Sequence, residues 1–287
     1  MMQRTIDTHI HVWDLDKAEY SWLKGDESIL NRSYALEELE DERKAAGITE
    51  GLLVQAASNM EDTDWMLRVA AGKDWIRGVV GWLPLMDPVL SARILEDKYA
   101  VTPLLKGVRH MIHNETDARW LLQLPVMESL GLLAVRDLPY DLVGINPAHI
   151  MTALKVVEMI PGLRIVFDHL NQPPIATGDQ FGLWGELMRE AARHPNFHVK
   201  ISGMGTTAGK GMDWQAADLQ PYIAFVLEHF GEDRCFCGGD WPVSLLAGSY
   251  AGTWNAYRQI IDKELDVEGR EKLWYGNAER FYKLSGE

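Results

Sequence analysis

Short apolar runs alternate with longer amphipathic stretches along the whole of this 287-residue sequence. This alternation is typical of β-α units, which build a parallel sheet covered by helices. Eight runs are predicted to be strands, over residues 4–11, 52–55, 76–82, 105–110, 132–136, 164–169, 197–202 and 234–240. No Gly-x-Gly-x-x-Gly turn follows any of them. Eight strands without that turn predict a closed (β/α)8 TIM barrel, an α/β fold, rather than an open Rossmann sheet.

Length and composition restrict the organisation and the partners. Barrels of this kind run to about 250 residues as one domain, and no linker divides the chain, so residues 1–287 are predicted to form a single domain. The formal charge of -14 argues against nucleic acid or an acidic membrane surface as partner. We expect neither a membrane span nor a signal peptide, because the apolar runs are short and charges interrupt the first dozen residues. These features predict a cytoplasmic protein that binds a small molecule, and they leave open whether it forms a homo-oligomer.

The first strand carries two histidines two residues apart. Side chains alternate between the two faces of a strand, so His9 and His11 point the same way, with Ile10 between them on the other side. Asp7 shares their face, and Trp13 follows at once. Two imidazoles are therefore expected to converge on one spot.

Other polar residues stand where the predicted strands end, which is where the active sites of barrel enzymes lie. The candidates at strand ends are His9, His11, Gln55, Trp82, Arg109, His110, Arg136, His169, Lys200 and Asp240. Asp240 is the strongest, because Gly238 and Gly239 give the backbone room for close approach and Pro242 makes the following turn rigid. An aspartate in that place also commonly caps a turn. Arg109 could fork onto a substrate or form a salt bridge at the barrel rim, and for His110 and Arg136 the structural and functional interpretations are about equal.

The motifs together resemble the sugar-lactonase group of the amidohydrolase superfamily, which includes lactonases of fuconate and rhamnonate catabolism and pyrone-dicarboxylate lactonase. The resemblance runs from Asp7 to Tyr282, and the order of the motifs is more specific than any one of them. The matching segments are Asp7-x-His9-x-His11, Lys106-Gly107-Val108-Arg109, Asp168-His169, Lys200-x-Ser202-Gly203, Gly239-Asp240-x-Pro242 and Gly276-Asn277-Ala278. Gly239 departs from the small hydroxyl residue often found at its position.

This resemblance implies a hydrolase that opens a sugar lactone, a 1,4- or 1,5-lactone of a 6-deoxy-hexonate such as L-fuconate, in L-fucose degradation. It implies that Asp240 takes a proton from the attacking water and that His9, His11 and His169 stabilise the tetrahedral oxyanion. The residues expected to contact substrate are Arg109, His110, Trp13, Gln55, Trp241 and Arg136.

A metal at this site is optional on the sequence alone. His9, His11 and Asp240 could hold a single zinc ion, with or without His169, because catalytic zinc sites use three protein ligands and a water. A binuclear centre is not expected, since Lys106 lies at the wrong end of its strand and the predicted fifth strand ends in Arg136. A site that works without metal is equally consistent with the resemblance.

Two other functions compete with the lactonase. A decarboxylase of the same superfamily would use the same histidines and aspartate with a tightly bound metal. A catalytically inactive sugar-binding barrel is the other alternative, and the intact His9, His11 and Asp240 argue against it.

Overall fold

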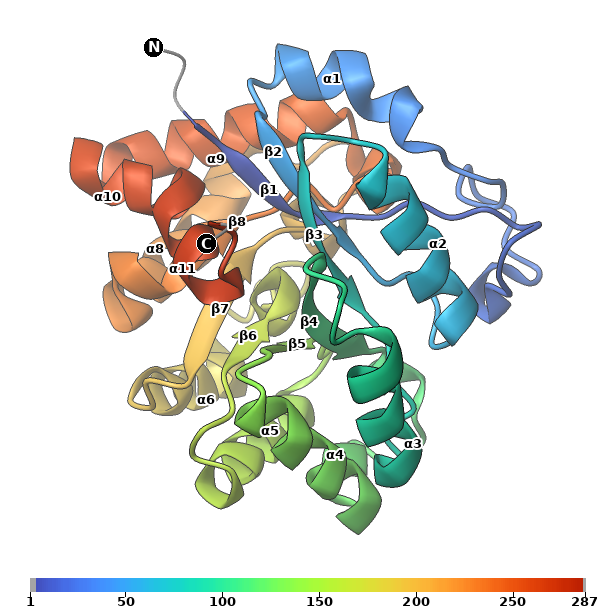
Figure 1. Ribbon diagram of the computed structural model, residues 1–287. Helices are drawn as coiled ribbons and strands as arrows, with labels where there is room; N and C mark the ends of the chain where they lie inside the picture. The colour runs from blue at the N-terminus through green and yellow to red at the C-terminus, as the bar shows by residue number, and fades with distance from the viewer. Residues whose placement is uncertain (1–3, 286–287) are drawn as a thin grey trace.

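The computed structural model describes residues 4–285, and its centre is one sheet of eight parallel strands. Each strand pairs with the next one along the chain, and helices surround the ring (Figure 1). The strands are β1 Ile6–Ile10, β2 Glu50–Val54, β3 Ile76–Gly81, β4 Leu105–His110, β5 Tyr140–Leu142, β6 Ile165–Phe167, β7 Phe197–Ile201 and β8 Cys235–Cys237.

The ring closes between its first and last strands. Ile10 forms a parallel bridge with Trp241, just beyond β8. The amide of His11 donates to the carbonyl of Trp241 at 2.7 Å, and the amide of Asp240 donates to the carbonyl of His9 at 2.8 Å. The predicted (β/α)8 barrel is therefore confirmed, and its closure places the His-x-His segment beside Asp240.

Helices connect the strands and cover the outside of the ring (Figure 1). They are α1 Glu40–Ala45, α2 Met60–Ala71, α3 Pro88–Arg93, α4 Leu124–Val135, α5 Pro147–Met159, α6 Gly182–Ala192, α7 Met204–Thr207, α8 Ala216–Phe230, α9 Tyr250–Glu264, α10 Val267–Glu271 and α11 Asn277–Tyr282. The side chain of Asn146 caps α5 by accepting a hydrogen bond from the amide of His149, as its position before Pro147 predicts. Between residues 4 and 285 no helix combines the length and the apolar character that crossing a membrane requires.

One predicted strand is wrong. Residues 132–136 were expected to form strand five, but Leu132–Val135 are the last turn of α4. Val126, Met127, Leu130 and Leu133 are buried at helical spacing, so this apolar segment packs as one face of a helix. The actual β5 is only three residues long and begins at Tyr140.

The C-terminal helix α11 packs at the amino ends of the strands, and it lies beside β7 and β8 in Figure 1. Phe281 and Tyr282 join a buried cluster with Ile6, Leu52 and Phe236, all of which point into the barrel. The carbonyl of Lys283 accepts a hydrogen bond from Lys106, near the start of β4. The amino end of the barrel is thus filled by apolar side chains, which leaves the carboxyl end for the site.

Candidate active site at the carboxyl end of the barrel

Asp240 lies at the centre of three histidines. Its Oδ1 atom is 3.4 Å from Nε2 of His11, 3.7 Å from Nε2 of His9 and 4.0 Å from Nε2 of His169. All four side chains are buried. His9 and His11 come from β1 and its end, His169 follows β6, and Asp240 follows β8. The structure therefore brings together all four residues that were predicted to be catalytic.

The hydrogen bonds of His11 fix which nitrogen faces Asp240. Nδ1 of His11 lies 2.8 Å from the carbonyl oxygen of Val54, which can only accept. Nδ1 therefore carries a proton, and Nε2 is the nitrogen that faces Oδ1 of Asp240. A cation or a proton between these two atoms, which lie 3.4 Å apart, stabilises the contact.

His9 is held from both sides. Nη1 of Arg109 lies 3.1 Å from its Nε2 atom, and because a guanidinium has no acceptor, Nε2 must carry the lone pair. The proton is then on Nδ1, which lies 3.4 Å from Oδ1 of Asp168 and 3.3 Å from Nζ of Lys200, and of these two only the carboxylate can accept it. Burial lowers the pKa of His9 well below its ordinary value, although the charge of Asp168 opposes this shift, so the ring is neutral.

A charge network lies beneath the histidines, inside the barrel. Nζ of Lys200 is 2.7 Å from Asp141 and 2.9 Å from Asp168, and none of these three side chains is exposed. The hydroxyl of Tyr282, from α11, also donates to Asp141 at 2.7 Å. Burial would raise the pKa of Asp168, but Lys200, His9 and Arg109 hold it well below its usual range. Asp168 is therefore a fixed negative charge that orients His9.

His169 is presented by an unusual backbone turn. Residues 169–172 all have φ between 48° and 54°, and none of them is glycine. Each residue in this left-handed region costs roughly 1–2 kcal/mol, so surrounding contacts must hold the turn in place. Trp184 donates to the carbonyl of Leu170 at 2.8 Å, and Ser202 lies 2.9 Å from Nδ1 of His169. Asp240 has φ 55° as well, so strain accumulates at the site itself.

Arg109 has almost all of its donors occupied. Nε donates to the side-chain oxygen of Gln55 at 2.9 Å, and Nη2 donates to the backbone carbonyl of Gln55 at 2.7 Å. The two hydrogens of Nη1 face Asp168 and His9, each at 3.1 Å. A guanidinium has five N–H donors, so one N–H on Nη2 has no partner among residues 4–285.

A cavity of about 370 Å³ opens above these groups. Its lining combines His11, Arg109, His169 and Asp240 with side chains from the loops around the barrel, which are Trp13, Trp22, Ala56, Met111, His113, Val143, Ile145, Gln172, Thr206, Thr207, Val243 and Leu246. Its size and its mixture of apolar walls and a few polar groups are typical of small-molecule sites. The long loop after β1 thus contributes Trp13 and Trp22 to the cavity.

Four residues that were predicted to contact substrate lie elsewhere. Arg136 follows α4, before β5 begins, and is paired with Glu96 at 2.9 Å, so the structure does not bring it to the carboxyl end. His110 faces away from Arg109, its neighbour on β4. It stacks on Trp120 with ring centroids 4.2 Å apart and lies 2.8 Å from Glu115.

The other two of the four residues are buried behind the cavity. Trp241 is 2% exposed and packs edge-on against Tyr34, so its ring is part of the core. Gln55 is fully buried and reaches the site only through Arg109. The position of Trp241 follows from the alternation of side chains at a strand end, which turns only every second residue toward the cavity.

Three residues of the site were not among the predicted candidates, and Lys200 was a candidate without an assigned role. Asp168 stands in a motif that the sequence presents beside His169, so a signal for it existed. Asp141 could not be placed, because its strand was assigned to the wrong residues. His113 lies in a short turn after β4, where no pattern marks it.

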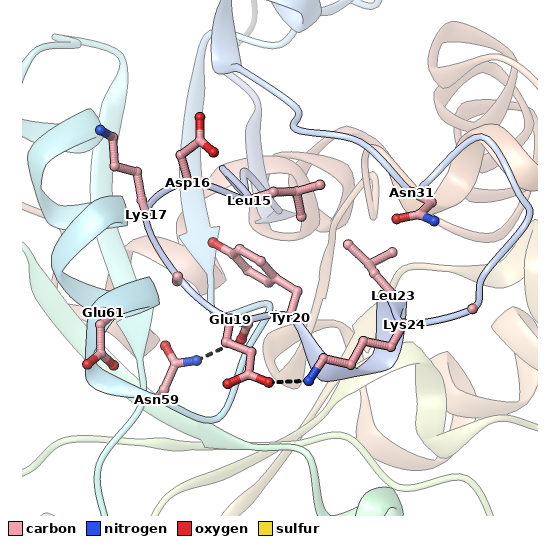
Figure 2. A pocket seen from close by; sticks show the side chains of 12 residues that line it. Leu15, Asp16, Lys17, Glu19, Tyr20, Leu23, Lys24, Asn31, Asn59 and Glu61 are labelled. Atoms are coloured by element: carbon pink, nitrogen blue, oxygen red, sulfur yellow. Dashed lines mark hydrogen bonds and ion pairs between the residues drawn. The ribbon is translucent and has the colours of Figure 1, made fainter.

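A larger hollow of about 810 Å³ lies between the loop after β1 and the start of α2 (Figure 2). Figure 2 shows Lys24 paired with Glu19, and Asn59 donating to the carbonyl of Glu19. Glu19 and Lys24 are largely exposed, and the lining contains no histidine. Its volume is greater, but it lacks the converging buried groups of the smaller cavity.

His9, His11 and Asp240 also fit a divalent cation. Their ligand atoms lie within 4.8 Å of one another, and all three side chains are buried. Two imidazole nitrogens and a carboxylate are the donors that zinc prefers. The donor set is therefore compatible with a single metal ion.

A closed β/α barrel with a buried aspartate and histidines at the carboxyl ends of its strands defines a barrel enzyme of the acid–base or metal-assisted type. The chain belongs to the amidohydrolase family, whose model matches residues 6–284.

Relatives with known names cover nearly all of the chain. An L-fucono-1,5-lactonase of Burkholderia ambifaria is 34% identical over 283 residues, covering 97% of this chain and 95% of the relative. An L-fucono-1,5-lactonase of Burkholderia multivorans is 29% identical and covers 97% of this chain and 96% of the relative. A crystal structure of an amidohydrolase from Burkholderia multivorans with bound zinc has a TM-score of 0.90 and 29% identity, over 98% of this chain and all of that one.

Proposed function

We propose that this protein is a lactonase that hydrolyses the 1,4- or 1,5-lactone of a 6-deoxy-hexonate, with L-fucono-1,5-lactone as the first candidate. The observation that carries the proposal is the position of Asp240 at the floor of the cavity, with Oδ1 within 4.0 Å of three imidazole nitrogens. The activity of the two Burkholderia lactonases, which match this chain over nearly its whole length, supports the same substrate.

Asp240 acts as the general base in the proposed reaction. Its carboxylate takes a proton from a water molecule, and the oxygen of that water attacks the carbonyl carbon of the lactone. When the tetrahedral intermediate collapses, the bond between the carbonyl carbon and the ring oxygen breaks. Asp240 returns the proton to that oxygen, so the products are a hydroxyl group and a carboxylic acid. The acid ionises at neutral pH and releases one proton for each turnover.

Arg109 is the proposed donor to the oxyanion. One N–H on its Nη2 atom has no partner among the described residues, and the side chain lines the cavity. A fixed cation with one free donor in a buried site stabilises developing negative charge effectively. His169 lies on the same wall, while His9 accepts from Arg109 through Nε2. We therefore propose that His9 positions Arg109 and does not itself touch the oxyanion.

The cavity walls suit a deoxy sugar. Met111, Val143, Ile145, Val243 and Leu246 offer apolar surface for a methyl group, and Trp22 offers a ring for stacking. Trp13 is 1% exposed and packs edge-on against Trp22, so it supports this wall from behind. Hydroxyl groups can bond with the polar groups on the same wall, which are His113, Gln172, Thr206 and Thr207.

His113 is suited to accept a hydrogen bond from a sugar hydroxyl. Burial and the charge of Arg109 lower the pKa of His113 to about 4, so its ring is neutral. Its Nδ1 atom faces the carbonyl of Val143 at 3.5 Å, which leaves Nε2 as an acceptor.

A divalent metal, when bound, would be held by His11 and Asp240 with His9, and would supply a Lewis acid that polarises the lactone carbonyl. The proton transfers assigned to Asp240 do not require it. Residues 1–287 would serve this function as a single domain.

Acid release, followed with a pH indicator, tests the proposal. The substrates are L-fucono-1,5-lactone, L-fucono-1,4-lactone and L-galactono-1,4-lactone, which differs from the second by a hydroxyl group on C6. Each rate is corrected for hydrolysis without enzyme, because 1,5-lactones open spontaneously. We expect turnover that is fastest for a fuconolactone.

Metal dependence and the competing function are separated in the same assay. Enzyme treated with chelator is compared with enzyme given zinc, and carbon dioxide release from hydroxybenzoic acids is measured beside acid release. Absence of lactone hydrolysis in both samples would refute the lactonase, and carbon dioxide release would identify a decarboxylase instead.

A further inference from the structure

We infer that Arg109 competes with metal ions for His9, so that this chain holds a divalent cation weakly and its metal-free site is a stable state. The inference concerns metal binding, which is measured directly, and it does not depend on the proposed reaction.

A metal at this site needs one particular lone pair of His9. Nδ1 of His9 is enclosed by Asp168 at 3.4 Å and by Nζ of Lys200 at 3.3 Å, inside the barrel. Nε2 is the nitrogen that faces Asp240, and only this atom can share a cation with Asp240 and His11. Nη1 of Arg109 already donates to that lone pair at 3.1 Å. An imidazole nitrogen cannot accept a hydrogen bond and bind a metal with the same lone pair.

Arg109 cannot leave easily, because three further hydrogen bonds hold its guanidinium. Gln55 accepts two of them, through its side chain at 2.9 Å and its backbone carbonyl at 2.7 Å. Asp168 accepts the third at 3.1 Å. The side chain of Arg109 is 5% exposed, so water cannot replace these partners readily. Moving the guanidinium aside would leave both Gln55 and Asp168 with unsatisfied buried groups.

Charge adds to the competition. A divalent cation at Nε2 of His9 would stand close to a permanent positive charge, on a guanidinium that is 5% exposed. Lys200 contributes a second buried positive charge on the far side of the same ring. By contrast, no cationic side chain among the described residues donates to Nε2 of His11, which lies 3.4 Å from Oδ1 of Asp240. His11 and Asp240 are thus ready for a metal, whereas His9 becomes available only when Arg109 moves.

Zinc titration of matched variants tests this inference. Arg109→Met removes the competing donor and its charge at similar size, and Arg136→Met removes the same charge from the pair with Glu96, away from the cluster. Free zinc is set with a chromogenic chelator, and the dissociation constant is measured for each protein. We expect Arg109→Met to bind zinc about tenfold or more tightly than the wild type, the factor that corresponds to losing one charged hydrogen bond. Arg136→Met should stay within about twofold of the wild type, because surface charges are screened.

A second variant keeps the charge of Arg109 in place. Gln55→Leu removes one of the hydrogen bonds that hold the guanidinium, so zinc should again bind more tightly than in the wild type, by a smaller factor. Absorption of bound cobalt reports the ligands independently, and the cobalt spectra of both variants should indicate one more imidazole than that of the wild type. Equal zinc affinity in the wild type and Gln55→Leu, or equal gains in Arg109→Met and Arg136→Met, would overturn the inference. The Gln55→Leu comparison decides the matter if Arg109→Met does not fold.

Discussion

Gly203 lies directly against the imidazole of His169. A Cβ atom placed on Gly203 would be 2.6 Å from Nδ1 of His169 and 2.9 Å from Oδ2 of Asp240. Gly203 also has φ +56°, in the region that side chains rarely adopt. The chain leaves β7 at this residue, so glycine lets the backbone approach two proposed catalytic groups at once.

Gly203→Ala should therefore reduce activity by more than its effect on stability explains. The added methyl group must displace His169 or Asp240, and we expect kcat/KM for the lactone to fall at least about tenfold, as small misplacements of reacting groups do. Gly211→Ala is the matched control, because Gly211 has φ +55° and a Cβ there would meet nothing within 4 Å. Both variants carry the same backbone strain of roughly 1–2 kcal/mol, so a difference between their activities reports the steric contact at Gly203. Equal activity in the two variants would show that Gly203 does not shape the site.

Asp240→Asn tests the general base. The amide keeps the size of the side chain but cannot take a proton from water, so kcat should fall by a factor on the order of 10³. The KM for the neutral lactone should change little. The chain should also keep its thermal stability, because Oδ1 of Asp240 lies among nitrogens that an amide can meet. Near-normal turnover in this variant would exclude Asp240 as the base.

The sequence predicts the cluster of His9, His11, His169 and Asp240 because each follows or ends a strand, and parallel strands bring their carboxyl ends together. What it does not predict is the direction of individual side chains. His110 and Trp241 were grouped with Arg109 and Asp240, their neighbours in the chain. In the structure, alternation turns His110 onto Trp120 and Trp241 into the core.

The error in strand five has a different origin. A short apolar run such as Leu132–Val135 fits a buried strand and a buried helix equally well, and only its continuity with Val126 and Met127 reveals the helix. The real β5 has three residues and includes Asp141, whose charge gives no strand signal. Sequence reasoning could therefore reach Lys200 and Asp168 but not Asp141, which lay in an unrecognised strand.

Substitutions of Lys200 and Asp141 should have non-additive effects on the free energy of unfolding. Lys200→Met leaves Asp141 and Asp168 buried without their shared partner, which should cost about 3–5 kcal/mol of unfolding free energy. Adding Asp141→Asn removes one of the two unpaired carboxylates, and the amide can still accept from Tyr282. The double variant should then be more stable than Lys200→Met alone. Urea unfolding of the wild type, Lys200→Met, Asp141→Asn and the double variant completes the double-mutant cycle. Additive losses of unfolding free energy would contradict the coupling.

Asp7 links β1 to the segment after β8 and reaches α9, outside the ring of strands. Its Oδ1 atom accepts from the amides of His9 and Gly239, both at 2.8 Å, and its Oδ2 atom lies 2.7 Å from the hydroxyl of Tyr250. Burial raises the pKa of Asp7 to about 7, although these hydrogen bonds oppose the shift. A Cβ on Gly239 would lie 2.5 Å from Oδ2 and 2.4 Å from the ring of Tyr250, so glycine at this position makes room for the contact. Asp7, expected beside His9 and His11, thus supports the closure of the barrel instead.

Asp7→Asn should therefore make the free energy of unfolding less dependent on pH. An acid whose folded pKa is about 7, against 3.8 when unfolded, contributes stability below pH 4 that is lost as pH rises through 7. Asparagine does not titrate, its oxygen can accept from both amides, and its NH2 group can donate to Tyr250. The unfolding free energy of the variant minus that of the wild type should grow between pH 4 and pH 8, by roughly 4 kcal/mol at most. Urea unfolding across this range measures the difference, and Asp97→Asn, on the surface, controls for the lost charge. A difference that stays flat with pH would mean that Asp7 is already ionised in the folded protein at pH 4, held so by its three hydrogen bonds.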